Sequence, residues 1–164
     1  MSMPLKELKA DFSKSLLSSY ANIAIMEVRM NNNSTLPRPS YKEILYMYCI
    51  YCIDDCTASD LVELFNTSKA LVSQTVISME RKGFVTRIKD PQDNRRQILR
   101  VSDETMMTYS DEMTVIDESL KRMDEMYSVE DIVKSAKIVK EVTDCMLRVS
   151  TEMHTRKKQH FIRM

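Results

Sequence analysis

Only one glycine, Gly83, occurs among the 164 residues of this chain, and only four prolines accompany it. Because glycine and proline are the residues that most often end helices and form turns, their scarcity predicts long helices, few turns and no flexible linker. Gly83 follows residues 68–82, where Val72, Val76 and Met79 are spaced four and three residues apart and predict a buried helical stripe. Glycine tolerates the left-handed conformation that closes a helix, so this helix is expected to end there.

The opposite face of this helix is polar and positively charged, and it carries Lys69, Ser73, Gln74 and Ile77. Residues 57–65 predict a short helix ahead of it, with Thr57 as the N-cap and Asp60 as the carboxylate that completes a capping box. Residues 66 and 67 then form the turn between the two helices. This order of elements is that of a helix-turn-helix.

A β-hairpin is predicted after the glycine. Residues 84–88 and 97–101 are β-rich runs, and residues 89–96 between them contain a proline and an Asp/Asn cluster that are typical of a loop. The chain as a whole is balanced, with 24 basic and 24 acidic residues. Residues 66–100, however, hold eight basic residues and three acidic ones, so positive charge is concentrated on the helix and the hairpin.

Amphipathic patterns before and after this unit predict further helices at residues 4–30, 41–53, 102–127 and from residue 128 onwards, with Ser40, Ser102 and Ser128 as N-caps. Their apolar residues recur every three or four positions. Stripes of this length need a partner surface that a small winged unit cannot provide. A mainly α fold with a small β-hairpin wing is therefore expected to form an intertwined helical homodimer.

The helix order, residues 72–85, the loop at residues 90–96 and the restart at Ser128 together resemble the MarR family of winged helix-turn-helix transcriptional regulators. The resemblance covers nearly the whole chain, and its most specific part is Asp93-x-Arg95 in the wing. Asn94 and Thr105 depart from it, because such families often have an arginine and a glycine there. The resemblance implies a single domain, residues 1–164, in which residues 40–102 form the DNA-binding region and residues 1–36 and 103–164 form the dimerisation region.

The resemblance also implies a homodimer that binds double-stranded DNA at a pseudo-palindromic operator and acts as a repressor until a small molecule releases it. Each recognition helix is then expected to enter a major groove, and each wing a neighbouring minor groove. An arginine at a loop tip suits the narrow minor groove, so Arg95 is the candidate there, and Asp93 is expected to hold the loop in shape. Gln74 and Ser73 are the candidates for base edges, because glutamine pairs well with adenine.

The remaining candidates are expected to bind phosphates, which supply affinity without sequence information. Candidates of this kind are Lys69, Arg87 and Arg96, which carry the charge, and Thr57, Ser59 and Ser68, which lie at helix N-termini. The candidate DNA-binding residues also have a simpler interpretation that does not involve DNA. Arg87 and Arg96 are compatible with solvated charges on an exposed hairpin, and Ser73 and Gln74 with ordinary surface positions on a helix.

Four cysteines in a chain with no secretion signal predict reduced thiols rather than disulfides. Cys49, Cys52 and Cys56 have a spacing that would suit metal binding or oxidation. We favour a structural role, because Leu45, Tyr48, Cys49 and Cys52 follow the helical spacing of a buried stripe. The peroxide-sensing members of the family place their reactive cysteine in the first helix, and residues 4–30 contain none. A regulator switched by thiol oxidation stays open as an alternative.

The sequence contains no nucleophile motif, glycine-rich phosphate loop or set of metal ligands, so we expect neither an enzyme nor a cofactor. His154 and His160 lie near the C-terminal end, apart from other ligands, and a basic tail follows at residues 156–158 and Arg163. No apolar run is long enough to span a membrane, and the chain is expected to be cytoplasmic.

The resemblance implies, finally, a small aromatic effector that binds in a crevice beside the DNA-binding region. Candidate lining residues are Met26, Met30, Tyr41, Met47, Tyr48 and Met107. Methionines also fill irregular core space, so a purely structural role for these side chains stays open. A winged-helix interaction module that binds no DNA is the other alternative for the chain as a whole.

Overall fold

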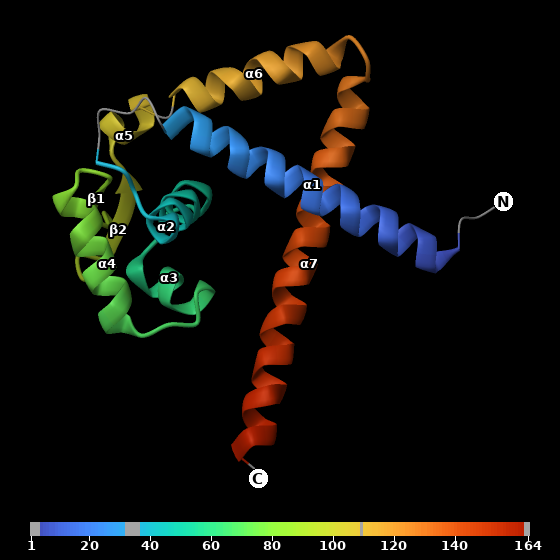
Figure 1. Ribbon diagram of the computed structural model, residues 1–164. Coiled ribbons are helices and arrows are strands. Elements are labelled where there is room, and N and C mark those ends of the chain that lie inside the picture. The colour runs from blue at the N-terminus through green and yellow to red at the C-terminus, as the bar shows by residue number, and fades with distance from the viewer. Residues whose placement is uncertain (1–3, 32–36, 109, 163–164) are drawn as a thin grey trace. The chain divides into compact units, whose positions relative to one another are not determined.

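The computed structural model describes residues 4–31, 37–108 and 110–162 (Figure 1). Its elements are, in order, α1 (Leu5–Asn31), α2 (Tyr41–Cys52), α3 (Ala58–Leu64), α4 (Lys69–Arg81), β1 (Val85–Lys89), β2 (Gln97–Val101), α5 (Asp103–Thr108), α6 (Ser110–Asp124) and α7 (Val129–Ile162). The predicted mainly helical fold with a small antiparallel hairpin is confirmed. The chain divides into two compact units, Met1–Thr114 and Val115–Met164. None of the described helices is long and apolar enough to cross a membrane.

The helix starts of the first unit are set by local capping, as predicted. The Ser40 and Glu43 side chains each accept a hydrogen bond from the other residue's backbone N–H, at 3.3 and 2.7 Å. Thr57 and Asp60 form the same reciprocal box at the start of α3, at 3.4 and 2.7 Å. Ser68 Oγ accepts from the backbone N–H of Leu71 (3.2 Å) at the start of α4. Each box satisfies N–H groups that have no partner within their own helix.

The end of α4 lies at Gly83, which adopts the left-handed conformation with φ of 79°. The N–H of Phe84 donates to the carbonyl of Met79 (2.9 Å), and the N–H of Gly83 donates to the carbonyl of Glu80 (3.0 Å). These two bonds are the Schellman pattern that closes a helix. A Cβ atom at Gly83 would meet nothing within 4 Å, so the need for glycine there is conformational rather than steric.

The core of the first unit is formed by α2, α3, α4 and the hairpin. The stripe of Val72, Val76 and Met79 is fully buried, as predicted. In the hairpin Val85 pairs with Val101, and Leu99 N–H donates to the Cys56 carbonyl (2.7 Å), which attaches the segment before α3 to the sheet. The buried side chains that complete this core are Tyr46, Met47, Ile50, Cys56, Leu61, Phe84, Val85 and Leu99.

Our prediction of which face of α2 is buried is wrong. Its buried residues are Glu43, Tyr46, Met47 and Ile50, whereas Tyr48 is 38% exposed and Cys52 is exposed. Apolar residues lie on more than one face of this helix, so spacing alone could not decide which face enters the core. Tyr48 contacts α1 instead of the core, because its hydroxyl donates a hydrogen bond to the Glu27 carboxylate of α1.

The predicted single helix at residues 102–127 is described as α5 and α6, and residue 109 between them lies outside the described residues, as do residues 1–3, 32–36, 163 and 164. Thr105, where a glycine was expected from the family resemblance, is fully buried in α5. Its hydroxyl donates to the Gly83 carbonyl (3.3 Å), and Ser102 Oγ donates to the same carbonyl (2.5 Å). The departure at Thr105 therefore links α5 to the end of α4.

The second unit consists of the greater part of α6 and all of α7. Ser128 Oγ accepts from the backbone N–H of Asp131 (3.1 Å), which confirms Ser128 as the cap of the last helix. Leu120, Met123, Val139 and Met146 are all exposed in the single chain. Helix α7 continues through residues 156–158, whose side chains, with those of His154 and His160, are not described; Arg163 lies outside the described residues. The division into dimerisation and DNA-binding regions stays a prediction.

An ion pair between a half-buried lysine and a buried carboxylate joins the end of α4 to the start of α2. Glu43 is only 4% exposed, and Lys82 Nζ lies 2.7 and 3.0 Å from its two carboxylate oxygens. Burial alone would raise the pKa of Glu43, but the hydrogen bonds from Lys82 and Ser40 outweigh it and hold the pKa below its ordinary value. The carboxylate is therefore charged at neutral pH and depends on its partners.

Replacing Lys82 by methionine should leave this carboxylate without its cation and lower the free energy of unfolding by about 1–3 kcal/mol. Lys121 forms an exposed pair with Glu118 on α6 (2.6 Å), so Lys121→Met is the matched control and should cost no more than about 0.5 kcal/mol. Urea denaturation at one protein concentration measures both. Because the folded pKa of Glu43 lies below 4.5, the contribution of the pair should be present above that pH and be lost as the pH falls through the folded pKa. Equal losses in the two variants would contradict this role.

Candidate nucleic-acid interface

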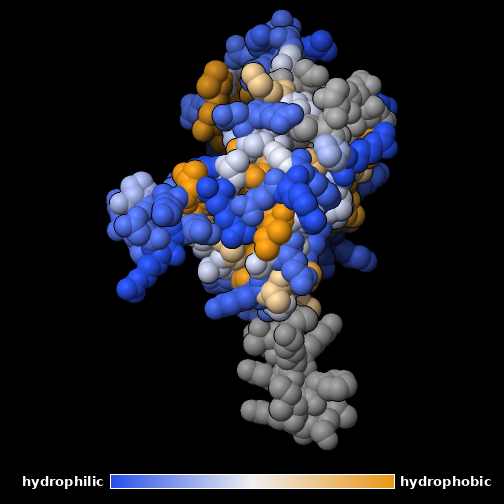
Figure 2. All heavy atoms as spheres, turned by 90° about the vertical axis from the view of Figure 1, so that its left-hand side faces the viewer, coloured by the Kyte–Doolittle hydropathy of each residue, from blue (hydrophilic) through white to orange (hydrophobic). Residues whose placement is uncertain are grey.

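The outward face of α4 is the first part of the candidate site. With the core stripe on one side, the helical spacing places Ala70, Gln74, Ile77 and Arg81 on the opposite side, with Lys69 and Ser73 beside them. All six are exposed, and the outward positions predicted for Lys69, Ser73, Gln74 and Ile77 are confirmed. Figure 2 faces the side of the molecule on which α4 and the hairpin lie in Figure 1, and hydrophilic residues predominate on it.

The wing loop is ordered by Asp90, which sequence reasoning did not single out. Its buried carboxylate accepts hydrogen bonds from the backbone N–H groups of Gln92 (2.8 Å) and Asp93 (3.4 Å) and from Arg96 Nη1 (3.0 Å). The Gln92 N–H and then the Arg96 guanidinium hold the pKa of Asp90 below its ordinary value. Asp93 Oδ1 accepts from the Arg95 N–H (2.9 Å), in keeping with its expected role in shaping the loop.

Both arginines that were predicted to bind phosphates already have partners within the protein. Arg96 pairs with Asp90 and also donates to the backbone carbonyl of Asp55 (2.9 Å). Arg87 pairs with Glu80 (3.0 Å). Arg100, on the strand that follows Arg96, lies 2.6 Å from the Asp55 carboxylate. The contacts of Arg96 and Arg100 with Asp55 attach the wing to the α2–α3 loop, and that of Arg87 attaches it to α4. Contacts of Arg87 and Arg96 with phosphates stay a prediction.

Asp55 is a second residue that the sequence did not reveal. Its φ is 51°, in the left-handed region that aspartate tolerates better than most residues with a Cβ atom. This conformation presents its carbonyl and its carboxylate to two arginines of the wing. An aspartate just after a helix end is a common signal, and nothing local indicates partners forty residues further along the chain.

Four basic residues of the helix-hairpin segment are not paired with an acid among the described residues. Within residues 66–100, all of which the structure describes, Lys69, Arg81, Lys89 and Arg95 form no ion pair, whereas the other four basic residues do. The acids of this segment are occupied, because Glu80 and Asp90 pair with arginines and Asp93 accepts a backbone N–H. The unpaired cations therefore lie on α4, on β1 and at the wing tip.

A polar groove brings two groups of predicted residues together. It has a volume of about 490 Å³ and lies between the start of α3 and the wing. Thr57 and Ser59 line it from one side, and Asp93, Arg95 and Arg96 from the other. The Thr57 hydroxyl is already committed to Asp60 (2.7 Å), so Ser59 is the freer hydroxyl. Ser68, Lys69, Ser73 and Gln74 do not line this groove and belong to α4 and its cap.

The cysteines are free thiols with different surroundings. Cys56 is fully buried, and burial, followed by the nearby Asp60 carboxylate, raises its pKa to about 11. Burial also raises the pKa of Cys49. Cys52 and Cys145 are exposed. Within the described part of the chain, no group of three His, Cys, Asp or Glu side chains is arranged to hold a metal ion.

Thiol alkylation of the native protein should follow these surroundings, because the thiolate is the reacting form. Iodoacetamide at about pH 8 should modify Cys52 at least tenfold faster than Cys56, whose high pKa and burial leave little accessible thiolate at that pH. Peptide mass spectrometry over time measures both sites in one sample. In urea the two rates should become similar, which serves as the control. Rapid modification of Cys56 in the native protein would show that this part of the core opens readily.

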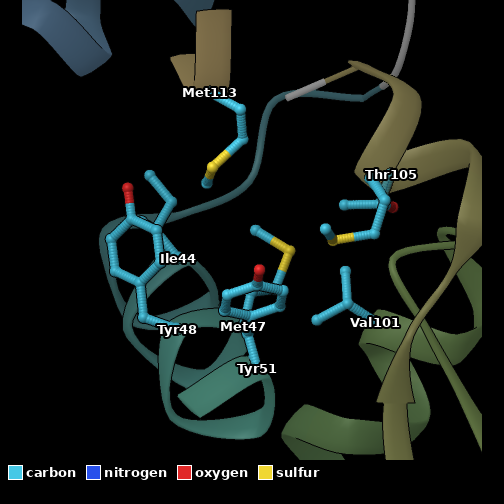
Figure 3. Close-up of a pocket in the computed structure, with 8 residues that line it drawn as sticks. Ile44, Met47, Tyr48, Tyr51, Val101, Thr105 and Met113 are labelled. Carbon is cyan, nitrogen blue, oxygen red and sulfur yellow. The ribbon is translucent and has the colours of Figure 1, made fainter. Parts of the chain in front are cut away.

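A small apolar cavity lies between α2 on one side and β2 and α5 on the other, with Met113 of α6 pointing into it (Figure 3). Its lining residues are Ile44, Met47, Tyr48, Tyr51, Val101, Thr105, Met106 and Met113. Its volume is about 50 Å³, far below the roughly 300 Å³ at which pockets for small ligands begin. The cavity has to widen before any aromatic molecule fits.

Three of the five expected crevice residues whose side chains are described do not line this cavity. Met47 and Tyr48 do, but Met107 is 77% exposed, and its neighbour Met106 lines the cavity instead. Tyr41 is also exposed, and its hydroxyl lies 2.6 Å from that of Tyr20 on α1. Met26 is half-buried on α1 away from the lining, and the side chain of Met30 lies outside the described residues. A helix turns by about 100° per residue, so the choice between Met106 and Met107 depends on the direction of α5.

Two helices joined by a tight turn and followed by a hairpin define a winged helix-turn-helix unit, and comparison with known proteins shows which family has such a unit. Residues 40–96 match the MarR family. The transcriptional regulator BilQ of Clostridioides difficile (strain CD3) is 27% identical over 103 residues, which cover 60% of this chain and 70% of BilQ. Residues 40–96 therefore form a MarR family domain, and the chain is similar to a transcriptional regulator.

Two solved structures share the fold. The crystal structure of Streptococcus pneumoniae FabT in complex with DNA matches with a TM-score of 0.61 and 19% identity, covering 84% of this chain and 96% of that one. A MarR family protein from Bacillus stearothermophilus matches with a TM-score of 0.60 and 18% identity, covering 88% and 99%.

Proposed function

We propose that this protein is a sequence-specific transcriptional regulator that binds double-stranded DNA as a homodimer. The observation that carries the proposal is the division of charge within residues 66–100. Lys69, Arg81, Lys89 and Arg95 are unpaired, while the acids of the same segment are occupied. Unpaired cations on a helix and a wing tip suit a polyanion, because each neutralised phosphate releases counterions. FabT, which shares the fold, was crystallised with DNA.

The site divides into parts that contact the backbone and parts that read sequence. We expect Lys69, at the first position of α4, to contact a phosphate. Ser59 and Arg96 line the groove beside the wing, where we expect a DNA backbone to pass. Gln74 projects from the outward face and has the chemistry to pair with adenine. Arg95 at the wing tip is suited to a narrow minor groove, where the negative potential is strongest.

The exposed apolar stripes support a homodimer. Leu8 and Phe12 on α1 and Leu120 and Met146 on α6 and α7 are between 40% and 52% exposed in the single chain. Such stripes favour burial against another surface, and a second copy supplies matching ones. Two recognition helices then predict a pseudo-palindromic operator with half-sites about 10 base pairs apart, or a multiple of that distance.

Repression relieved by a small aromatic molecule is the form of regulation we propose. The supporting observation is the apolar cavity beside α2, with Tyr48 and Tyr51 in its lining. Thiol oxidation is the alternative, and the raised pKa values of Cys49 and Cys56 argue against both as sensors. Only the exposed Cys52 of the three remains a candidate for that alternative.

Selection of bound genomic fragments with the purified full chain tests DNA binding directly, and the enriched sequence provides the operator. On that operator, Lys69→Ala should weaken binding and reduce the slope of log affinity against log salt by about one unit for each phosphate that is no longer neutralised. Lys134 on α7 is exposed and serves as the matched control, because Lys134→Ala removes the same charge from α7 rather than from α4. Fluorescence anisotropy at several salt concentrations measures both variants. Failure to enrich any sequence would favour the interaction module without DNA binding.

Sedimentation velocity at micromolar concentration should give a single species with the mass of two chains. Leu120→Asp, which places a charge on an exposed apolar stripe of α6, should shift the protein towards monomer. Lys121→Asp, at the neighbouring position on the polar side, should leave the dimer in place. A well-folded wild-type monomer at this concentration would contradict the dimer.

A further inference from the structure

An isoleucine lies in the middle of the most outward stripe of α4. Ala70, Gln74, Ile77 and Arg81 are spaced four, three and four residues apart, which places them on one line of the helix surface. This line is opposite the fully buried stripe of α4. Ile77 is 52% exposed, and its neighbours one turn away on this line are Gln74 and Arg81. A large branched apolar side chain is thus presented to the outside between two polar ones.

The fold does not account for this isoleucine. Val72, Val76 and Met79 are each 0% exposed, so the core contact of α4 is complete without Ile77. A branched residue in an exposed helix position is also less favourable for the helix than alanine or a straight-chain residue. Exposed isoleucines do occur singly on protein surfaces, but this one occupies the face that the proposed function directs into a major groove.

The major groove offers one apolar group that such a side chain can recognise. Among the base edges there, thymine alone carries a methyl group, while the other groups are hydrogen-bond donors and acceptors. An aliphatic side chain cannot hydrogen-bond to those polar edges and would displace water from them without compensation. Against a methyl group the same side chain buries apolar surface on both partners.

We propose that Ile77 is a specificity-determining residue that selects thymine by contact with its 5-methyl group. The inference rests on the proposed DNA-binding function and adds a readout that hydrogen bonds from Gln74 cannot supply. Because Gln74 lies one turn away on the same line, the thymine read by Ile77 belongs to the same half-site as the adenine read by Gln74. In a homodimer the two selected thymines are symmetric about the operator centre.

The test removes the methyl group from the DNA and the side chain from the protein. The probes are the duplex selected by the wild-type full chain and a series in which each symmetric pair of thymines is replaced by deoxyuridine, which lacks only the 5-methyl group. Wild type should lose affinity about three- to fivefold per half-site at one pair of positions. Ile77→Ala should bind the thymine duplex more weakly by a similar factor and should be insensitive to the replacement at that pair.

Two further variants make the measurement specific. Leu64→Ala removes an exposed leucine from α3, off the outward face of α4, and should keep the full response to deoxyuridine. Ile77→Val keeps the branched Cβ and should retain an intermediate response, so the test does not depend on one variant. Circular dichroism and urea denaturation should show all three variants to be folded, because the altered side chains are exposed.

The outcomes separate this inference from the function on which it rests. If wild type enriches no sequence, the proposed function itself fails. If an operator is found, and Ile77→Ala responds to deoxyuridine as wild type does at every position, the contact with thymine is refuted while DNA binding stands. Loss of the response at one symmetric pair, in Ile77→Ala alone and partly in Ile77→Val, supports the proposal.

Discussion

The end of α4 at Gly83 is the constraint on which the geometry of the winged unit depends. Glycine there permits a φ of 79°, so the chain leaves the helix abruptly and enters the hairpin. The preceding residue, Lys82, pairs with buried Glu43 of α2, and the Gly83 carbonyl accepts hydrogen bonds from Ser102 and Thr105 at the start of α5. Helices α2, α4 and α5 and the hairpin therefore meet at Lys82 and Gly83. The direction of α4 relative to the hairpin follows from this junction, and the outward face of α4 follows from that direction.

Within the unit, some basic residues are paired inside the protein and others are not. Arg96 and Arg100 are held by Asp55 and Asp90, and these contacts fix the wing against the α2–α3 loop. Arg95, next in sequence to Arg96, has no such partner among the described residues, because its backbone N–H rather than its guanidinium is bonded to the wing. Arg96 is thus held by an ion pair, whereas the guanidinium of its neighbour Arg95 is not. A wing held in place by one arginine leaves the other free to contact a ligand without first having to break an ion pair.

Sequence reasoning succeeded where a feature depends on nearby residues and failed where it depends on distant ones. The N-caps at Ser40 and Thr57 and the closure at Gly83 were predicted because their partners lie within a few positions. The partners of Asp55 lie more than forty residues away in the wing, and no local pattern indicates them. The buried face of α2 was wrong for a related reason, because apolar residues on several faces leave the choice to packing. Cys52 is exposed, so the stripe of α2 that we predicted to lie in the core is partly on the surface.

Thr105 of α5 connects the cavity to the end of α4. Thr105 lines the cavity and donates a hydrogen bond to the Gly83 carbonyl (3.3 Å), while Val101, also in the lining, pairs with Val85 just beyond the glycine. Met47 closes the other side from α2, whose first turn holds Lys82 through Glu43. A cavity of about 50 Å³ cannot admit an aromatic ring without separating these two sides. Both sides are attached to the last turn of α4, so separating them would disturb contacts that support that turn.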